Sequence, residues 1–226
     1  MGKIKEKAVC LVSGGMDSLV SMAMAIEDYD VCMMHAYYGQ LTQERELKAF
    51  RDISAHYSID KVMTFSLSTL AQIGGSSLTD PEIDVHTGGL VDGIPNTYVP
   101  FRNAHLLSAA VSWAEVLGAS RVFIGAVEED SSGYPDCRES FFRAFEKVVV
   151  EGTLPGTKIE IVTPLLHLTK TEIVRKGIQM RVPFELSWSC YKNNEKACGV
   201  CDSCILRLRA FEGAGLEDPI LYEEKG

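Results

Sequence analysis

The stretch Leu11-Val12-Ser13-Gly14-Gly15-Met16-Asp17-Ser18 decides the fold class, because it joins an apolar strand to an amphipathic helix. That helix carries apolar side chains on one face, at Leu19, Met22, Ala23 and Ile26. Two adjacent glycines let the backbone turn sharply and come close to a ligand. Main-chain N–H groups at the start of a helix, together with the helix dipole, form a site for anions. The stretch therefore predicts a phosphate-binding loop between a strand and a helix.

Three polar side chains in this loop add to the predicted anion site. Ser13 and Ser18 offer hydroxyl donors, and Asp17 can cap the helix or help to hold Mg²⁺. Two common phosphate-binding motifs, G-x-x-x-x-G-K-[ST] and G-x-G-x-x-G, do not match the stretch. A glycine turn whose helix is capped by Asp or Ser is the simpler alternative, and it needs no ligand.

Outward from the loop, apolar strands continue to alternate with amphipathic helices. We predict strands at Lys7–Val12, Asp30–Ala36, Lys61–Ser66, Arg121–Ile124 and Ile159–Val162. We predict helices at Ser18–Glu27, Thr42–Tyr57, Asn103–Leu117, Arg138–Val150, Thr169–Gln179 and Ser203–Phe211. This alternation is typical of βαβ units, so we expect an α/β fold with a doubly wound, mostly parallel sheet.

Three stretches rich in turn-forming residues interrupt the alternation, at residues 68–100, 125–136 and 183–200. Long loops in a compact domain usually carry function. Ligands of open α/β sheets bind beyond the carboxyl ends of the strands, where the order of the strands reverses. We therefore expect the chemistry in the loops that follow strands.

The composition favours an enzyme that acts on small molecules. With 46% hydrophobic and 23% charged residues, the 226-residue chain resembles an ordinary folded domain with an appendage. A net charge of -9 argues against stable nucleic-acid binding, which needs a basic face. The apolar runs are too short to span a bilayer, and residues 1–7 lack the apolar core of a signal peptide. We expect a cytoplasmic protein with no membrane partner.

Four of the seven cysteines form a cluster near the end of the chain, at Cys190, Cys198, Cys201 and Cys204. Four thiolates complete a tetrahedral Zn²⁺ site and leave no open coordination position, so the predicted zinc ion, one per chain, is structural. An iron–sulfur cluster is the alternative metal centre, but no Cys-Pro follows the cluster. Reduced core cysteines are a third reading, which the polar residues 191–196 disfavour. Cys10 and Cys32 lie in apolar stretches, and we expect both in the core.

The loop S-G-G-x-D-S resembles the pyrophosphate loop (PP-loop) of the N-type ATP pyrophosphatases. Together with V-P-x-R-N at residues 99–103, S-G-Y-P-D-C-R at residues 132–138 and the cysteine cluster, it resembles the family of 7-cyano-7-deazaguanine synthases of the queuosine and archaeosine precursor pathways. The resemblance extends from Lys7 to about Ile220. Phe101 stands where many members of the family carry glycine.

The resemblance implies a ligase that forms C–N bonds, with the adenine nucleotide alpha hydrolase-like fold. Such an enzyme converts 7-carboxy-7-deazaguanine and ammonia to 7-cyano-7-deazaguanine, and ATP with Mg²⁺ drives the reaction through an adenylated carboxylate and an amide. It also implies a PP-loop ATP pyrophosphatase domain at residues 1–182 and a zinc-binding segment with four cysteine ligands, packed on it, at residues 183–226. Family members tend to dimerise, so we expect a homodimer.

The resemblance also assigns roles to residues. The nucleotide would be bound by Val12, Ser13, Gly14, Gly15, Met16, Asp17, Ser18, Leu19 and Val20. Catalytic roles would fall to Ser13, Asp17, Ser18 and Lys170. The deazaguanine would be surrounded by Arg102, Asn103, Tyr134, Asp136 and Arg138, with a carboxylate paired to its guanine-like N–H edge.

Two other functions remain open at this point. A related PP-loop enzyme could adenylate a deazaguanine carboxylate or a tRNA base in order to modify a macromolecule. A protein of another class, a zinc-finger binding module, would account for the four cysteines but leaves the glycine loop unexplained.

Overall fold

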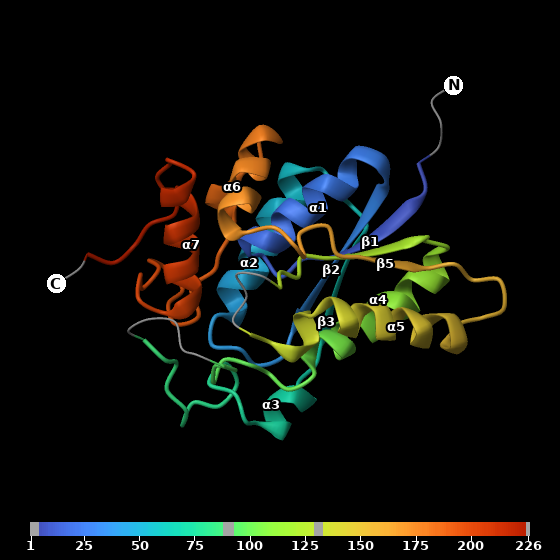
Figure 1. The fold of residues 1–226 in the computed structure, drawn as a ribbon, viewed down its shortest axis with the longest axis horizontal. Helices are drawn as coiled ribbons and strands as arrows, with labels where there is room; N and C mark the ends of the chain where they lie inside the picture. The colour runs from blue at the N-terminus through green and yellow to red at the C-terminus, as the bar shows by residue number, and fades with distance from the viewer. Residues whose placement is uncertain (1–4, 88–92, 129–132, 225–226) are drawn as a thin grey trace.

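The computed structural model of the chain describes residues 5–87, 93–128 and 133–224. Its centre is a parallel sheet of five strands in the order β3-β2-β1-β4-β5 (Figure 1). The strands are β1 (Lys7–Leu11), β2 (Asp30–Tyr37), β3 (Val62–Ser66), β4 (Arg121–Ile124) and β5 (Glu160–Val162). All five predicted strands are confirmed, and their ends differ from the predicted ends by no more than one residue.

Seven α-helices connect and cover the strands within the described residues. They are α1 (Met16–Asp28), α2 (Gln43–His56), α3 (Thr69–Ile73), α4 (Arg102–Leu117), α5 (Glu139–Gly152), α6 (Lys170–Gln179) and α7 (Asp202–Gly213). Two short 3-10 helices, η1 (Pro135–Cys137) and η2 (Phe184–Leu186), lie in stretches predicted as loops. The six predicted helices are confirmed, whereas α3 was not predicted because its five residues are too few to show a helical period.

The two faces of the sheet are covered by different helices, as the doubly wound prediction requires. Along β1, Ala8 and Cys10 pack in the core beneath α1, α2, α6 and α7, while Val9 and Leu11 pack in a second core beneath α4 and α5. The side chains of a strand alternate between faces, and β1 is apolar on both because both are buried. Cys10 and Cys32 are buried in these cores, as predicted.

The order of the strands places the chain reversal beside β1. The chain passes from β1 outward to β2 and β3, and then returns to the other side of β1 to form β4 and β5. The loops that follow β1 and β4 therefore leave the sheet in different directions and open a crevice between them. The predicted phosphate loop follows β1 and lies in this crevice.

The C-terminal segment packs against α6 and closes over the carboxyl ends of the strands (Figure 1). Arg207 holds this segment together: its guanidinium is buried, and it donates to both carboxylate oxygens of Asp218 at 2.7 and 2.9 Å. The same guanidinium donates to Ser187 Oγ and to the Phe184 carbonyl. Val182 and Phe184 lie on either side of the domain boundary predicted after residue 182, and both belong to the core beneath α1. The boundary stays a prediction.

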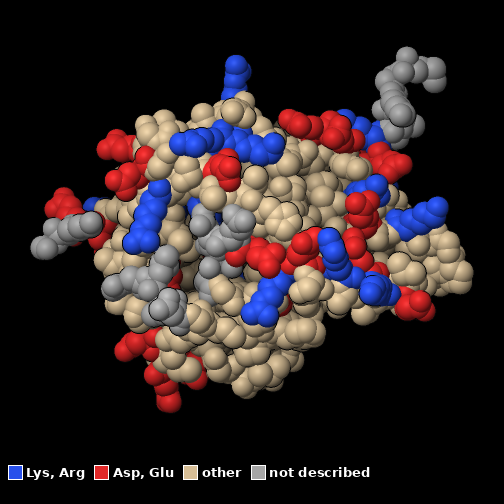
Figure 2. All heavy atoms as spheres, in the orientation of Figure 1, with Lys and Arg blue, Asp and Glu red and all other residues tan. Residues whose placement is uncertain are grey.

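No helix in the described part of the chain has the length and apolar character that crossing a membrane would require. On the face of the molecule drawn in Figure 2, acidic and basic side chains intermingle, and no continuous basic patch covers it.

Candidate active site

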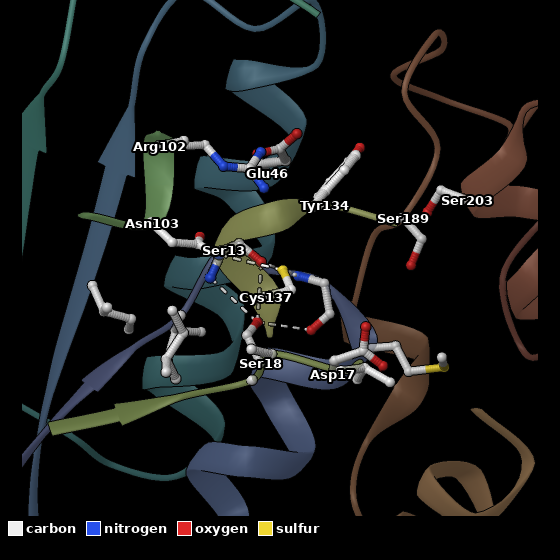
Figure 3. Close-up of a pocket in the computed structure, with 18 of the residues that line it drawn as sticks. Ser13, Asp17, Ser18, Glu46, Arg102, Asn103, Tyr134, Cys137, Ser189 and Ser203 are labelled. Atoms are coloured by element: carbon white, nitrogen blue, oxygen red, sulfur yellow. Dashed lines mark hydrogen bonds between the residues drawn. The ribbon is translucent and has the colours of Figure 1, made fainter. Parts of the chain in front are cut away.

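The predicted phosphate loop is held in shape by its own hydroxyl groups. Ser18 Oγ donates to the Gly15 carbonyl at 2.9 Å and accepts from Ser13 N at 3.2 Å. The two serine hydroxyls lie 3.2 Å apart, and Gly15 N donates to Ser13 Oγ at 3.3 Å (Figure 3). The loop therefore presents two hydroxyls and the start of α1 to the crevice, an arrangement suited to an anion.

Gly14 and Gly125 let other parts of the backbone come close to this loop. Gly14 has φ +89°, and a Cβ there would lie 2.7 Å from the carbonyl oxygen of Glu46. At Gly125, directly after β4, a Cβ would lie 2.7 Å from Ser18 N and 2.8 Å from Asp17 O. Both contacts are shorter than real Cβ atoms allow, so the two glycines are required for the loop to lie between α2 and β4.

Asp17 and Lys170 meet at the edge of the loop. Lys170 Nζ donates to Asp17 Oδ2 at 2.6 Å, and both side chains are largely buried. Thr169 and Glu172 form a complete capping box at the start of α6, which fixes Lys170 as its first residue. Among the described residues, no group donates to Asp17 Oδ1, although this oxygen is buried. A buried carboxylate oxygen without a donor suits a cation or a ligand proton.

His35 supports the loop from below. Its Nδ1 lies 2.9 Å from the Val12 carbonyl oxygen, so Nδ1 carries the proton and donates it. The ring is buried against Phe50, and burial lowers the pKa of His35 below its ordinary value. His35 is therefore a neutral side chain that fixes Val12, the first residue after β1.

A cavity of about 270 Å³ extends from this loop to the C-terminal segment. Its apolar part is lined by Met34, Ala36, Leu106, Ile124 and Ala126. Figure 3 shows Asp17 and Ser18 on one side of the cavity, Arg102 and Glu46 on another, and Ser189 and Ser203 on the C-terminal segment. An apolar slot with a few converging polar groups is the usual form of a small-molecule site.

Arg102 is the main cationic group opposite the loop. Its Nη1 donates to Tyr38 OH at 2.8 Å, and its guanidinium carbon lies 5.6 Å from the Tyr38 ring centre and 5.9 Å from the Tyr134 ring centre. Tyr134 OH is in turn 2.8 Å from Thr97 Oγ1. Arg102 and Tyr134, both predicted substrate residues, therefore line the cavity together.

The other predicted substrate residues have different positions. Asn103 lines the cavity, but its side chain donates to the Asp136 carbonyl at 2.8 Å and to Cys137 Sγ at 3.3 Å. Asp136 Oδ2 accepts from Asn103 N at 2.9 Å, so this carboxylate caps the start of α4. Arg138 is exposed just before α5. Neither Asp136 nor Arg138 is among the described residues that line the cavity.

Sequence reasoning missed several residues that line the cavity. They are Tyr38, Glu46, Trp188, Ser189, Tyr191, Asp202 and Ser203. Trp188 N donates to the Gly14 carbonyl at 2.8 Å and so joins the C-terminal segment to the phosphate loop. Only the loop character of residues 183–200 pointed to this region, because the contact joins residues 174 positions apart in sequence.

The four clustered cysteines come together as predicted, with all four sulfur atoms within 4.8 Å of one another. Cys198 Sγ and Cys204 Sγ are 3.9 Å apart, close to the edge of about 3.8 Å that a tetrahedron with Zn–S bonds of about 2.3 Å requires. The backbone N–H groups of Lys192, Asn193 and Cys198 point at Cys190 Sγ at 3.4 Å. Such N–H···S contacts stabilise metal-bound thiolates. The donor set therefore fits a closed metal site.

Comparisons with known proteins agree on one family. The family model of "Queuosine biosynthesis protein QueC" matches residues 7–215. The chain is 60% identical to the 7-cyano-7-deazaguanine synthase of Chlorobium chlorochromatii (strain CaD3) over 221 residues, which is 97% of each chain. It is 57% identical to the enzyme of the same name from Chlorobaculum tepidum over 219 residues, 96% of each chain.

Solved structures resemble the chain more distantly. The U34-tRNA thiolase NcsA from Methanococcus maripaludis is 14% identical, with a TM-score of 0.48, and the match covers 84% of this chain and 62% of that one. The NMN synthetase from Francisella tularensis is 15% identical, with a TM-score of 0.46, over 80% and 63% of the two chains.

Proposed function

The chain belongs to the QueC family of queuosine biosynthesis proteins, and we propose that it acts as a C–N bond-forming ligase that makes 7-cyano-7-deazaguanine from 7-carboxy-7-deazaguanine, ammonia and ATP. One observation carries this proposal beyond the family. The phosphate loop and the C-terminal segment with its four cysteines enclose a single cavity. The lining of this cavity offers an apolar slot, hydroxyl groups and the guanidinium of Arg102. Two reactants can be held side by side in such a cavity, as adenylation of a carboxylate requires.

The nucleotide occupies the part of the cavity beside the loop. Ser13, Ser18 and the first N–H groups of α1 bind the phosphates, and the apolar slot takes the adenine. Mg²⁺ would be held by the Oδ1 atom of Asp17, a buried oxygen to which no described residue donates, and it would neutralise phosphate charge. Lys170 lies next to this carboxylate and adds a second positive charge. These roles agree with the residues proposed from the family resemblance.

The chemistry consists of making an oxygen into a leaving group twice. The substrate carboxylate attacks the α-phosphorus of ATP and pyrophosphate leaves; ammonia then attacks the acyl carbon, and AMP leaves to give the amide. In the second round the amide oxygen attacks the α-phosphorus of another ATP and pyrophosphate leaves. Loss of the two nitrogen-bound protons and of AMP then gives the nitrile. The loop hydroxyls and Lys170 stabilise the charge that develops as pyrophosphate departs.

Cys137 takes no part in the proposed reaction, although it lines the cavity. Burial raises the pKa of its thiol to about 11. A thiol with such a pKa is almost entirely protonated near neutrality, and the thiolate is the form that attacks. The proposed route therefore uses no covalent intermediate on Cys137.

The four cysteines hold one structural Zn²⁺ ion in this proposal. A site with four thiolates supplies no open position, so the ion contributes to folding and takes no part in the reaction. We also propose a cytoplasmic homodimer. Two exposed apolar side chains support a dimer, those of Val116 and of Leu154, whose backbone N–H donates to the neighbouring Glu115 carboxylate.

The reaction product distinguishes the proposed ligase from a related enzyme that modifies a macromolecule and from a binding module. Purified protein is incubated with ATP, ammonium and 7-carboxy-7-deazaguanine, and the products are identified by mass spectrometry. We expect the nitrile, together with AMP and pyrophosphate, and we expect Asp17→Asn to abolish AMP formation while zinc content stays at one per chain. Amide without nitrile would instead favour an enzyme that modifies a macromolecule. Full zinc content with no turnover by the wild type would favour a binding module.

A further inference from the structure

Three carboxylates line the described part of the cavity, and they differ in what already binds them. They belong to Asp17, Glu46 and Asp202. Asp17 lies at the phosphate loop and is paired with Lys170. Both oxygens of Glu46 are occupied, one by Gln40 Nε2 at 2.9 Å and the other by Thr42 Oγ1 at 2.7 Å. Of the three carboxylates, Asp202 is therefore the one whose binding partner has still to be identified.

Asp202 is buried, and one of its two carboxylate oxygens has no hydrogen-bond donor among the described residues. The residue is 4% exposed, and its Oδ1 atom has no hydrogen-bond partner anywhere in residues 5–87, 93–128 and 133–224. The Nδ1 atom of His86 lies 3.8 Å from Oδ1, too far for a hydrogen bond. That Nδ1 atom is itself buried and unpartnered. Burying a carboxylate in this way is costly unless a ligand completes its hydrogen bonds.

The position of Asp202 is fixed by its neighbours in the chain. It is the first residue of α7 and lies between Cys201 and Cys204 of the metal site. Cys201 also forms an isolated bridge with Thr87, which holds the neighbouring loop in place. A carboxylate mounted on a closed metal site and a helix start is preorganised for binding.

The surroundings of Asp202 suit a flat heteroaromatic ring. The aromatic residues Trp188 and Tyr191 also line the cavity. Ser189 and Ser203 add hydroxyls on the same segment (Figure 3). The guanine-like edge of a 7-deazaguanine carries two adjacent donors, the N1–H and the 2-amino group. A carboxylate accepts two such parallel hydrogen bonds in one plane.

We propose that Asp202 is the specificity-determining residue that accepts hydrogen bonds from the N1–H and the 2-amino group of the deazaguanine substrate. This inference rests on the proposed function and names a residue within that site. It differs from the expectation drawn from the family resemblance, which placed Asp136 at the substrate. The Asp136 carboxylate is occupied in capping α4, whereas Asp202 lines the cavity and its Oδ1 atom has no donor in the described part of the chain.

The test compares two substrates in two proteins. The second substrate is 7-carboxy-7-deazahypoxanthine, which keeps N1–H but lacks the 2-amino group. For the wild type, we expect kcat/KM to fall roughly 10- to 100-fold when the 2-amino group is removed. For Asp202→Asn, we expect a fall of similar size with the natural substrate, and a further change below about 3-fold with the analogue. The KM for ATP should stay the same in both proteins.

Controls separate binding from folding. Glu212→Gln removes an exposed charge from the same helix and should keep both the kinetics and the zinc content of the wild type. Discrimination between the two substrates that is equally strong in Asp202→Asn would overturn the assignment. So would a rise in the KM for ATP equal to the rise for the base, which is expected of a merely structural residue.

A crystal structure of the wild type with 7-carboxy-7-deazaguanine gives an answer even if the variant does not fold. The assignment holds if the 2-amino nitrogen lies within hydrogen-bond distance of Asp202, and it is wrong if another residue binds that edge. A wild type that binds or converts no deazaguanine at all would overturn the proposed function, and the assignment with it. Conversion without a contact to Asp202 would overturn the assignment alone.

Discussion

At the scale of single residues, Gly125 limits the shape of the phosphate loop. Its position after β4 leaves 2.7 Å between a built Cβ and Ser18 N, so the first turn of α1 would have to move if any side chain were present. Its φ lies outside the left-handed region, so the requirement is for space and not for a glycine conformation. The contact joins loops that follow two different strands, and no pattern in the sequence marks it.

We predict that Gly125→Ala weakens nucleotide binding. The methyl group would displace Ser18 and Asp17, so the KM for ATP should rise roughly 10-fold or more, as expected for a loss of about 1.4 kcal/mol or more in binding. Steady-state kinetics with varied ATP provide the measurement. Gly152→Ala is the matched control, because a Cβ at Gly152 meets nothing within 4 Å. Equal ATP kinetics in the two variants would contradict the steric role.

The lowered pKa of His35 predicts how acid affects the stability of the fold. Burial lowers its pKa, so the unfolded chain binds a proton more readily than the folded chain. Its neutral form therefore supports the fold fully above the unfolded pKa of about 6.5, and that support is lost as pH falls from there through the lower folded pKa.

We expect urea unfolding of the zinc-loaded protein to reveal this dependence. The wild type should lose more stability than His35→Asn between about pH 7.5 and about pH 5.5, because asparagine can donate to the Val12 carbonyl without titrating. Zinc content must be measured at both pH values, since thiolate ligands also release metal in acid. Parallel pH profiles of the two proteins would show that His35 does not carry the effect.

At the scale of elements, the Arg207–Asp218 pair holds α7 to the end of the chain. Both side chains are buried, and Tyr222 OH also donates to Asp218 at 2.6 Å. Replacing only one partner leaves a buried charge unpaired, which costs about 3–5 kcal/mol. We therefore predict that Arg207→Met lowers the free energy of unfolding by this amount, measured in urea. Arg209→Met, an exposed change on the same helix, should have little effect, and a similar loss in both would contradict the prediction.

The elements themselves could be predicted because their signals are local. Apolar runs of four to eight residues marked β1 and β2, and the glycine loop fixed where α1 begins. The site was harder, because residues far apart in sequence build it. Tyr38 and Trp188 lie in the cavity through pairings that only the fold creates. Asp136 has a carboxylate in the right motif, but that carboxylate caps α4.

Phe101, directly before α4, is another residue whose structural role could not be predicted from the sequence alone. It has φ +58° just before α4, a left-handed conformation that glycine adopts without strain. That geometry gives a physical reason why the family resemblance implies a glycine at this position. Its side chain is exposed and contacts His105 and Phe141 edge-on, which gives the phenylalanine some compensating contact. The family resemblance pointed to this position, and the backbone angle gives its physical meaning.

At the scale of the whole molecule, the cysteine cluster links folding to the site. The segment that carries it supplies Trp188, Ser189, Tyr191, Asp202 and Ser203 to the cavity, and Trp188 also bonds to Gly14 in the phosphate loop. Its own contacts include a third core cluster around the cysteines. The sheet and the helices on it have separate cores that do not include the four sulfurs. Metal loss should therefore affect the substrate side of the cavity before it affects the sheet.

We predict that removing zinc with a chelator abolishes binding of 7-carboxy-7-deazaguanine while most of the helical signal in circular dichroism remains. Trp188 is 3% exposed, so a Trp113→Phe variant, in which Trp188 is the sole tryptophan, should shift its emission to longer wavelength as the segment loosens. Titration calorimetry measures base binding before chelation, after it, and after Zn²⁺ is returned. Mg²⁺ returned in its place should not restore binding, because thiolates are poor ligands for that ion.

Metal-free protein that binds the base with unchanged affinity and unchanged Trp188 emission would mean that Arg207 and the surrounding core hold the segment without the metal. In that case the cysteines would have no part in shaping the substrate side of the cavity.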